Sequence, residues 1–180
     1  HTAVAEIIEE NFKDKLELFY FDLAIHYDIS ENYDKAINFL SLAGEKNFYI
    51  SDFIHSEQCY KRILSIITEN KPFSEYLKDL DKNKLSEDSK PMFQVYINAK
   101  MNLGRIYLNT GKWNEGIEIL KTTLPYINFI DDQTKYDIYF TLGKIFNLKR
   151  ENKISKEYLN KSLDLTKAMK SKLNYAFILG

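Results

Sequence analysis

The sequence predicts an all-α fold, built as a solenoid of stacked helix pairs. Its 180 residues include only three prolines and six glycines, which leaves long stretches free to form helices. Hydrophobic residues make up 44% of the chain, enough to bury a core. A short motif also returns at intervals of a few tens of residues, which is the sequence signature of stacked helical units.

The motif is clearest at residues 103–107 (Leu-Gly-Arg-Ile-Tyr) and 142–146 (Leu-Gly-Lys-Ile-Phe), and a weaker form stands at residues 23–27. Residues 178–180 would open a further unit. Nine residues after each aromatic comes a short side chain, then a leucine four residues on, then another short side chain three residues later. The three sets are Ala36, Leu40 and Ala43; Gly116, Leu120 and Thr123; and Ser155, Leu159 and Ser162.

Small residues at these positions allow two antiparallel helices to approach closely. Gly104 and Gly143 are expected to admit the second helix of each pair at Gly116 and Ser155. Leucine and aromatic side chains then fill the space between successive pairs.

This pattern resembles the tetratricopeptide repeat (TPR) over most of the chain, and the resemblance implies a superhelical stack that binds other proteins. The sequence departs from the family where short residues other than alanine occupy the second helices. It also lacks a proline where the units would close, at Phe48, Asn128 and Lys167.

The first third carries a second resemblance, over residues 1–6, 20–27, 33–37 and 43–46. These stretches are similar to the start of the repeat region that follows a STAND or AAA-type ATPase module in large signalling proteins, often beside a class III nucleotidyl cyclase or a protein kinase. The first residue is His1 rather than Met, and Gly180 falls inside an apolar helical pattern. We therefore expect both ends to belong to a longer chain.

Helical spacing of apolar residues and local stop and start signals set the predicted elements. Thr110-Gly111 predicts a helix end, and Asp131-Asp132 predicts a helix start. The predicted helices span 3–11, 15–29, 33–46, 48–53, 55–68, 74–80, 92–109, 113–124, 132–148, 152–166 and 168–180.

These elements form one continuous solenoid with three parts. Residues 1–67 hold the N-terminal repeats, and residues 92–180 hold two regular repeats and the start of another. The stretch 68–91 between them is rich in lysine and aspartate, is bounded by Pro72 and Pro91, and is interpreted as an insertion or irregular unit.

Charge and cysteine content exclude several classes of partner. The 25 basic and 26 acidic residues are scattered, so a nucleic-acid partner is not expected. The single cysteine, Cys59, cannot form an internal disulfide, and the sequence contains neither a signal peptide nor an apolar run that could cross a membrane. We expect a cytoplasmic location without membrane contact.

Motifs that carry chemistry are missing. There is no glycine-rich phosphate loop, Gly-x-Ser-x-Gly elbow or His-Glu-x-x-His zinc helix, so neither catalysis nor a cofactor or metal is expected. His55 and Cys59 are four residues apart, but two ligands do not make a metal site, and a structural role is favoured. Asp22 and His26 lie one turn apart, and we expect a helix-surface hydrogen bond rather than a catalytic pair.

A partner-binding surface is expected on the concave side, where first-helix residues outside the packing positions face a ligand. Phe21, Met101 and Phe140 would form an apolar stripe, and Arg105 and Lys144 would select a carboxylate on the partner. The Lys and Asn pattern of chaperone-binding TPR domains is absent at Phe21 and Ile25. The nine predicted residues are Leu18, Phe21, Ile25, Asn98, Met101, Arg105, Asp137, Phe140 and Lys144.

Three functions remain open at this stage. The leading one is a protein-interaction or scaffold module of an intracellular signalling protein, which binds a partner protein or peptide, or another domain of the same parent chain. The first alternative is a sensor that binds a peptide or small ligand and regulates an attached effector. The second is an enzyme with an unfamiliar site around Asp22, His26 or His55.

Overall fold

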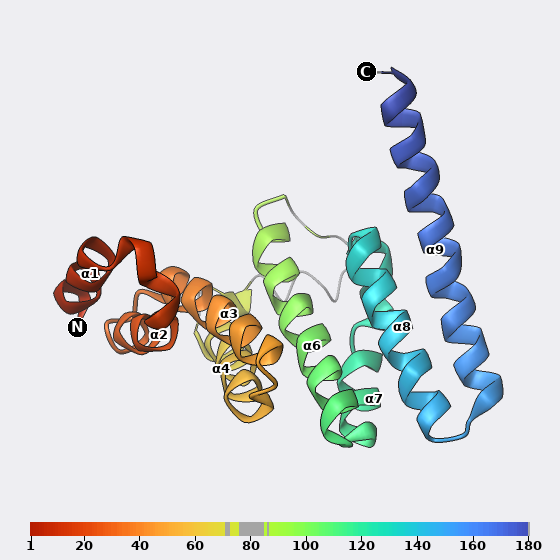
Figure 1. Ribbon diagram of the computed structural model, residues 1–180, viewed down its shortest axis with the longest axis horizontal. Coiled ribbons are helices and arrows are strands. Elements are labelled where there is room, and N and C mark those ends of the chain that lie inside the picture. The colour runs from red at the N-terminus through yellow and green to blue at the C-terminus, as the bar shows by residue number, and fades with distance from the viewer. Residues whose placement is uncertain (71–72, 76–84, 86, 180) are drawn as a thin grey trace. The chain divides into compact units, whose positions relative to one another are not determined.

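The structure, a computed structural model, describes residues 1–70, 73–75, 85 and 87–179. The described residues form helices joined by short turns, with no β-strand among them, so the all-α prediction is confirmed (Figure 1). The α-helices are α1 (Thr2–Asn11), α2 (Tyr20–Ile29), α3 (Tyr33–Tyr49), α4 (Phe53–Glu69), α6 (Lys90–Thr110), α7 (Trp113–Lys121), α8 (Asp132–Leu148) and α9 (Asn152–Leu179). Two 3-10 helices, η1 (Lys13–Leu18) and η3 (Leu124–Phe129), complete the described elements.

Side chains cap three of these helices at their first turn. Asn32, Asp52 and Asp131 each accept a hydrogen bond from the backbone N–H three residues on, at 3.4, 3.3 and 2.9 Å. Such caps satisfy N–H groups that have no partner inside the helix. The predicted bounds of α8, 132–148, are confirmed. The predicted stop at Thr110-Gly111 is also confirmed, because α6 ends at Thr110.

Four departures from the predicted helices are larger than two residues, each for a local reason. The predicted helix 48–53 is instead the end of α3 and a turn, because Asp52 caps a new helix that begins at Phe53. The predicted helices 152–166 and 168–180 are one helix, α9, because residues 152–179 contain no glycine or proline to end it.

The other two errors concern 3-10 helices. The predicted helix 15–29 is divided into η1 and α2, with a non-helical Lys15 and the Phe12 and Phe19 ring centroids 4.6 Å apart. The predicted helix 113–124 ends at Lys121, and a separate 3-10 helix, η3, begins at Leu124 with Pro125 in its first turn, where the N–H that proline lacks is not needed. Residues 76–80 of the predicted helix 74–80 and half of the predicted insertion 68–91 lie outside the described residues.

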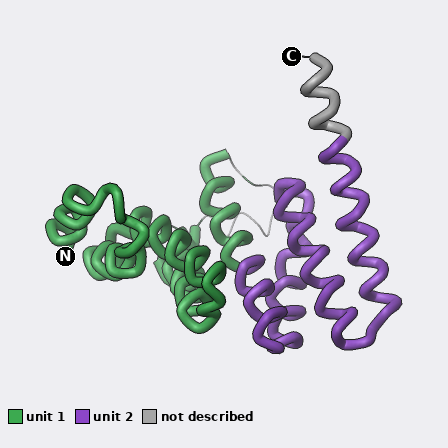
Figure 2. Tube along the Cα trace, in the orientation of Figure 1, with its two compact units in different colours: residues 1–99 green, residues 100–180 purple. Residues whose placement is uncertain are grey.

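The chain divides into two compact units, residues 1–99 and residues 100–180, with the division inside α6 (Figure 2). In unit 1, α3 packs against both α2 and α4. In unit 2, α7 and α9 each pack against α8. The fully buried side chains include Leu23 and Ile63 in unit 1 and Leu120 and Leu142 in unit 2.

The predicted glycines do mark points of close helix approach. A Cβ atom on Gly104 would lie 2.6 Å from Leu120, and one on Gly143 would lie 2.7 Å from Leu159. The predicted contact of Gly143 with Ser155 also forms, because the Ser155 hydroxyl donates to the Gly143 carbonyl at 2.9 Å. Only glycine leaves room for these contacts.

The same arrangement occurs in unit 1, where the sequence pattern is hidden. The Ser56 hydroxyl donates to the Gly44 carbonyl at 2.7 Å, twelve residues apart as in Gly143 and Ser155. A Cβ atom on Gly44 would lie 2.9 Å from Tyr60. Tyr60 follows Gly44 by sixteen residues, the same separation as between Gly104 and Leu120. Ala24 has the same spacing, because Ala36 follows it by twelve residues and Leu40 by sixteen. We call Ala24, Gly44, Gly104 and Gly143 the pivot residues.

A left-handed turn residue follows each pivot by seven positions. Its φ is positive in all four turns, and such a residue commonly ends a helix and reverses the chain. The turn residues are Glu31 (φ 57°), Ser51 (φ 63°), Gly111 (φ 76°) and Arg150 (φ 60°). Four helix-turn-helix segments therefore share one geometry, although only one of the turns contains the glycine that the conformation favours.

Candidate interaction surface

The nine predicted surface residues fall into the two units, which are described separately. Leu18, Phe21, Ile25 and Asn98 belong to unit 1, whereas Met101, Arg105, Asp137, Phe140 and Lys144 belong to unit 2.

In unit 1, two of the predicted residues line a small hollow. Its volume is about 140 Å³. Phe21 and Ile25, both on α2, are 38% and 40% exposed, and Leu40 of α3 is 4% exposed. The lining residues on α2, and likewise those on α4, recur every three or four positions and so share one helix face. The hollow is lined by Phe21, Ala24, Ile25, Asp28, Leu40, Gln58 and Arg62.

An ion pair forms part of the lining of the hollow. Arg62 donates from Nε and Nη2 to the two carboxylate oxygens of Asp28, at 2.6 and 2.7 Å, and from Nη1 to Ser65 at 3.1 Å. The hydrogen bonds to Asp28 raise the pKa of Arg62 above its ordinary value. This two-pronged geometry holds both side chains in place and fixes α4 against α2. Sequence reasoning missed the pair, since its members are 34 residues apart.

His55 lies beside the hollow, with its ring edge toward Phe21 at a centroid distance of 6.3 Å. Its Nδ1 is 2.7 Å from Asp52 Oδ2, and this hydrogen bond lowers the pKa of Asp52. Cys59 is fully buried, and burial raises the pKa of its thiol to about 12. His55 and Cys59 therefore occupy different environments, and a buried, protonated thiol is a poor metal ligand.

The other two predicted residues of unit 1 lie apart from the hollow. Leu18 belongs to η1 rather than to the following helix and is 60% exposed. Asn98 is half-buried and accepts a hydrogen bond from Gln94 at 2.8 Å.

In unit 2, the predicted apolar stripe is interrupted. Met101 is only 7% exposed, so it cannot serve as an open anchor. Phe140 is 38% exposed and stacks on Tyr136 at a centroid distance of 5.6 Å. The Lys144 ammonium lies 6.0 Å from the Phe140 ring centroid, within the range of a cation–π contact.

Arg105 is already engaged within its own unit, although the sequence predicts that it selects a carboxylate on the partner. Its Nη1 donates to Asn102 at 3.1 Å, and its charge acts on Asp137. Burial raises the pKa of Asp137, and the hydrogen bond from Gln133 and the charge of Arg105 only partly oppose the rise. The charge of Arg105 therefore already acts on a carboxylate of its own unit.

Comparison with protein-family models, with curated proteins and with solved structures gave no match for this chain.

The Asp22–His26 pair does not form the hydrogen bond that its spacing predicts. His26 Nδ1 lies 2.9 Å from His1 Nδ1 instead, and the two rings are 5.1 Å apart. Asp22 is exposed, one turn before His26 on α2. Among the described residues, no group of three or more His, Cys, Asp and Glu side chains is arranged to hold a metal ion.

A polar cluster between α1, α2 and α3 was not predicted from the sequence. The hydroxyl of the fully buried Tyr27 donates to Glu9, and Lys35 Nζ donates to Tyr27 Oη at 2.8 Å and to Glu9 Oε1 at 2.9 Å. Burial disfavours the Glu9 carboxylate, but the hydrogen bonds and the Lys35 charge outweigh it and lower the pKa of Glu9. The hydrogen bonds to Tyr27 and Glu9 raise the pKa of Lys35 to about 12. The cluster holds α1 on the rest of unit 1.

In the part of the chain that the structure describes, no helix has both the length and the hydrophobicity that crossing a membrane requires.

Proposed function

We propose that this chain is a TPR-like interaction module of a larger signalling protein, and that the hollow of unit 1 binds a segment of a partner protein or of a neighbouring domain. The four helix-turn-helix segments with a common pivot, turn and contact spacing support the repeat assignment. The observation that carries the binding proposal is the position of Phe21 and Ile25. Their place in the repeat alone predicts both as surface residues, and both line a hollow while remaining exposed.

The chemistry of the hollow suits one aliphatic side chain. A cavity of about 150 Å³ lined by apolar residues holds a molecule as large as benzene. At about 140 Å³, the hollow has room for a leucine, isoleucine or methionine side chain over Leu40. The Gln58 amide and the Arg62–Asp28 pair at the rim can hydrogen bond to the backbone of the bound segment. An apolar anchor with a polar rim is the usual anatomy of a protein interface.

A matched pair of substitutions on α2 tests this proposal. Peptides would first be selected on the unaltered chain from a displayed library, and their dissociation constants measured. Ile25→Arg places a charge in the hollow, whereas Ile29→Arg makes the same change one turn away at a residue that does not line it. Both isoleucines are exposed, by 40% and 56%, so the fold should tolerate both changes. We expect Ile25→Arg to weaken binding by about 100-fold, as for a central anchor, and Ile29→Arg to leave it nearly unchanged.

Equal affinity for the two variants, with helicity preserved in both, would show that the hollow is not the binding site. Selection of peptides without an aliphatic residue would contradict the anchor itself.

A further inference from the structure

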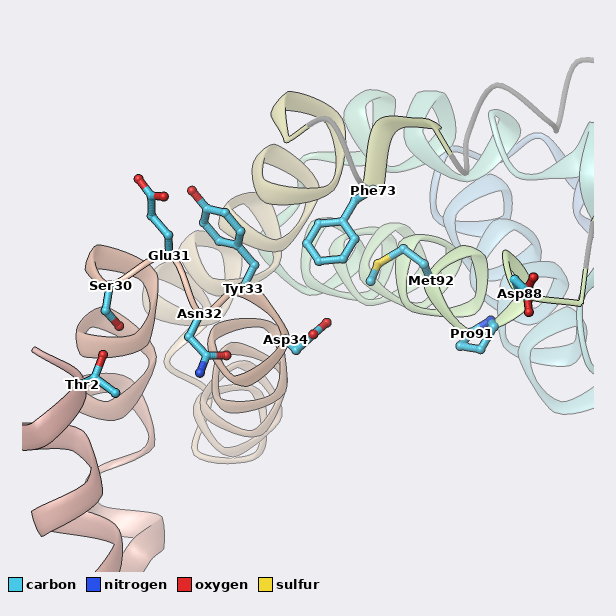
Figure 3. A pocket seen from close by; sticks show the side chains of 10 residues that line it. All are labelled: Thr2, Ser30, Glu31, Asn32, Tyr33, Asp34, Phe73, Asp88, Pro91 and Met92. Atoms are coloured by element: carbon cyan, nitrogen blue, oxygen red, sulfur yellow. The ribbon is translucent and has the colours of Figure 1, made fainter.

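A second cavity in unit 1 has a different chemistry. It has a volume of about 720 Å³ and lies between the turn that joins α2 to α3, Phe73, and the start of α6 (Figure 3). This size falls within the range of ligand pockets. We call it the acidic cavity, because the charged residues among its described lining are Glu31, Asp34 and Asp88, and none of the described residues that line it is Lys or Arg.

Helix dipoles offset only part of this negative charge. Asp34 stands in the first turn of α3, and Asp88 stands just before α6. Each helix N-terminus supplies about half a positive charge, and the C-terminus of α2 supplies about half a negative one. Three carboxylates therefore remain largely uncompensated by the backbone.

The cations on the neighbouring helices are already engaged. Lys35 of α3 pairs with Glu9 at 2.9 Å, and Lys90 of α6 pairs with Glu87 at 2.5 Å. Among the described residues, Asp34 and Asp88 take part in no ion pair. A positively charged ligand would therefore not have to displace a described internal partner.

An apolar wall completes the cavity. Phe73, which is 9% exposed, meets Tyr33 edge-on at a centroid distance of 6.3 Å. Figure 3 shows the Phe73 and Met92 side chains next to each other, with Asp34 and Asp88 to either side in this view and Glu31 pointing away from them. A ligand here would meet hydrocarbon and carboxylate together.

We propose that the acidic cavity binds a basic peptide segment of a protein partner, with an arginine or lysine side chain lying across Phe73 and Met92. The methylene groups of such a side chain cover apolar surface while its charged end reaches water or a carboxylate. The charged end hydrogen bonds to Asp34 or Asp88, and the aromatic rings add a cation–π attraction. This inference is independent of the hollow, since the two cavities share no lining residue.

The test uses the full chain and two fluorescein-labelled, capped peptides, Gly-Arg-Leu-Arg-Gly and Gly-Gln-Leu-Gln-Gly. The dissociation constant of each peptide is measured by fluorescence anisotropy at low salt. We expect the arginine peptide to bind at least about tenfold more tightly, which is the discrimination that one charge-assisted hydrogen bond gives. The Asp34→Asn, Asp88→Asn double variant should lose this preference. Glu45→Gln, which removes an exposed carboxylate from the same helix as Asp34, should keep it within about twofold.

Equal binding of the two peptides by the unaltered chain would overturn the proposal, and this comparison stands even where the double variant is destabilised. A folded double variant that retains the preference would overturn it as well. Loss of the preference in Glu45→Gln would show that the peptide responds to overall charge rather than to the cavity.

Discussion

The substitution Gly104→Ala tests the close packing of α6 against α7 at Leu120. The added Cβ atom would lie 2.6 Å from Cγ and Cδ2 of Leu120 and 2.7 Å from its Cδ1. Leu120 is 0% exposed, so its side chain has no open space into which to move. Overpacking of this kind costs about 1–3 kcal/mol, whereas alanine gains about 1 kcal/mol over glycine inside a helix. We expect a net loss of up to about 2 kcal/mol, which lowers the melting temperature by roughly 4–8 °C in a chain of this size.

A double-mutant cycle with Leu120→Ala isolates the contact, and urea unfolding gives the four free energies. Leu120→Ala alone should cost about 2–5 kcal/mol, because it leaves a cavity. It should cost at least about 1 kcal/mol less when Gly104 is already alanine, since the clash then disappears. Gly116→Ala serves as the control for the cycle, because its added Cβ would meet Ile145 at 2.9 Å and Tyr107 at 3.2 Å rather than Leu120, so Leu120→Ala should not relieve its cost. Additivity of the two changes within about 0.5 kcal/mol would refute the proposed clash.

Three further predictions concern charge, the thiol and the turns. The stability contributed by Glu9 and Lys35 should be fully present between about pH 4.5 and pH 10.5, and should be lost as the pH falls through the lowered pKa of Glu9 or rises toward about 12, the raised pKa of Lys35. Glu9→Gln should therefore cost about 1 kcal/mol near neutral pH and flatten the acid side of the profile measured by urea unfolding. Cys59 should not react with a thiol reagent at about pH 8 until the chain is unfolded, so rapid labelling of the native state would contradict its burial. Arg150→Gly should raise the free energy of unfolding by about 1 kcal/mol, because glycine adopts a φ of 60° without strain, and no gain in thermal unfolding would count against strain in this turn.

Local signals made part of the fold predictable. The bounds of α8 follow from the Asp131 cap and from the apolar spacing behind it, both of which lie within a few residues of the helix. The close contacts at Gly104 and Gly143 follow from the repeated motif. The length of α9 was missed because no residue in it ends a helix, and the repeat pattern suggested a break that the backbone has no reason to make.

The repeat position of a side chain did not determine its exposure. Phe21 and Met101 occupy equivalent positions three residues before a pivot, yet Phe21 is 38% exposed and Met101 is 7% exposed. Exposure depends on which side chains of other helices reach the residue, and the repeat does not conserve those. For the same reason the partners of Arg62 and Lys35, 34 and 26 residues away, could not be read from local spacing.

The position of the hollow follows from the pivot that differs from the others. Ala24 is the one pivot that is not glycine, and both Ala24 and its contact residue Leu40 line the hollow. In the glycine copies, the side chain sixteen residues on lies so close that even a methyl group would not fit; it is Tyr60 in one copy and Leu120 or Leu159 in the others. The methyl group of Ala24 is already present, so α2 cannot approach Leu40 as closely as α6 approaches Leu120. Gln58 and Arg62 of α4 also line this space, and the bidentate Arg62–Asp28 pair holds that part of the lining in place. A single methyl group in a repeated contact can thus account for an opening in unit 1, whereas the glycine contacts of unit 2 are tightly packed.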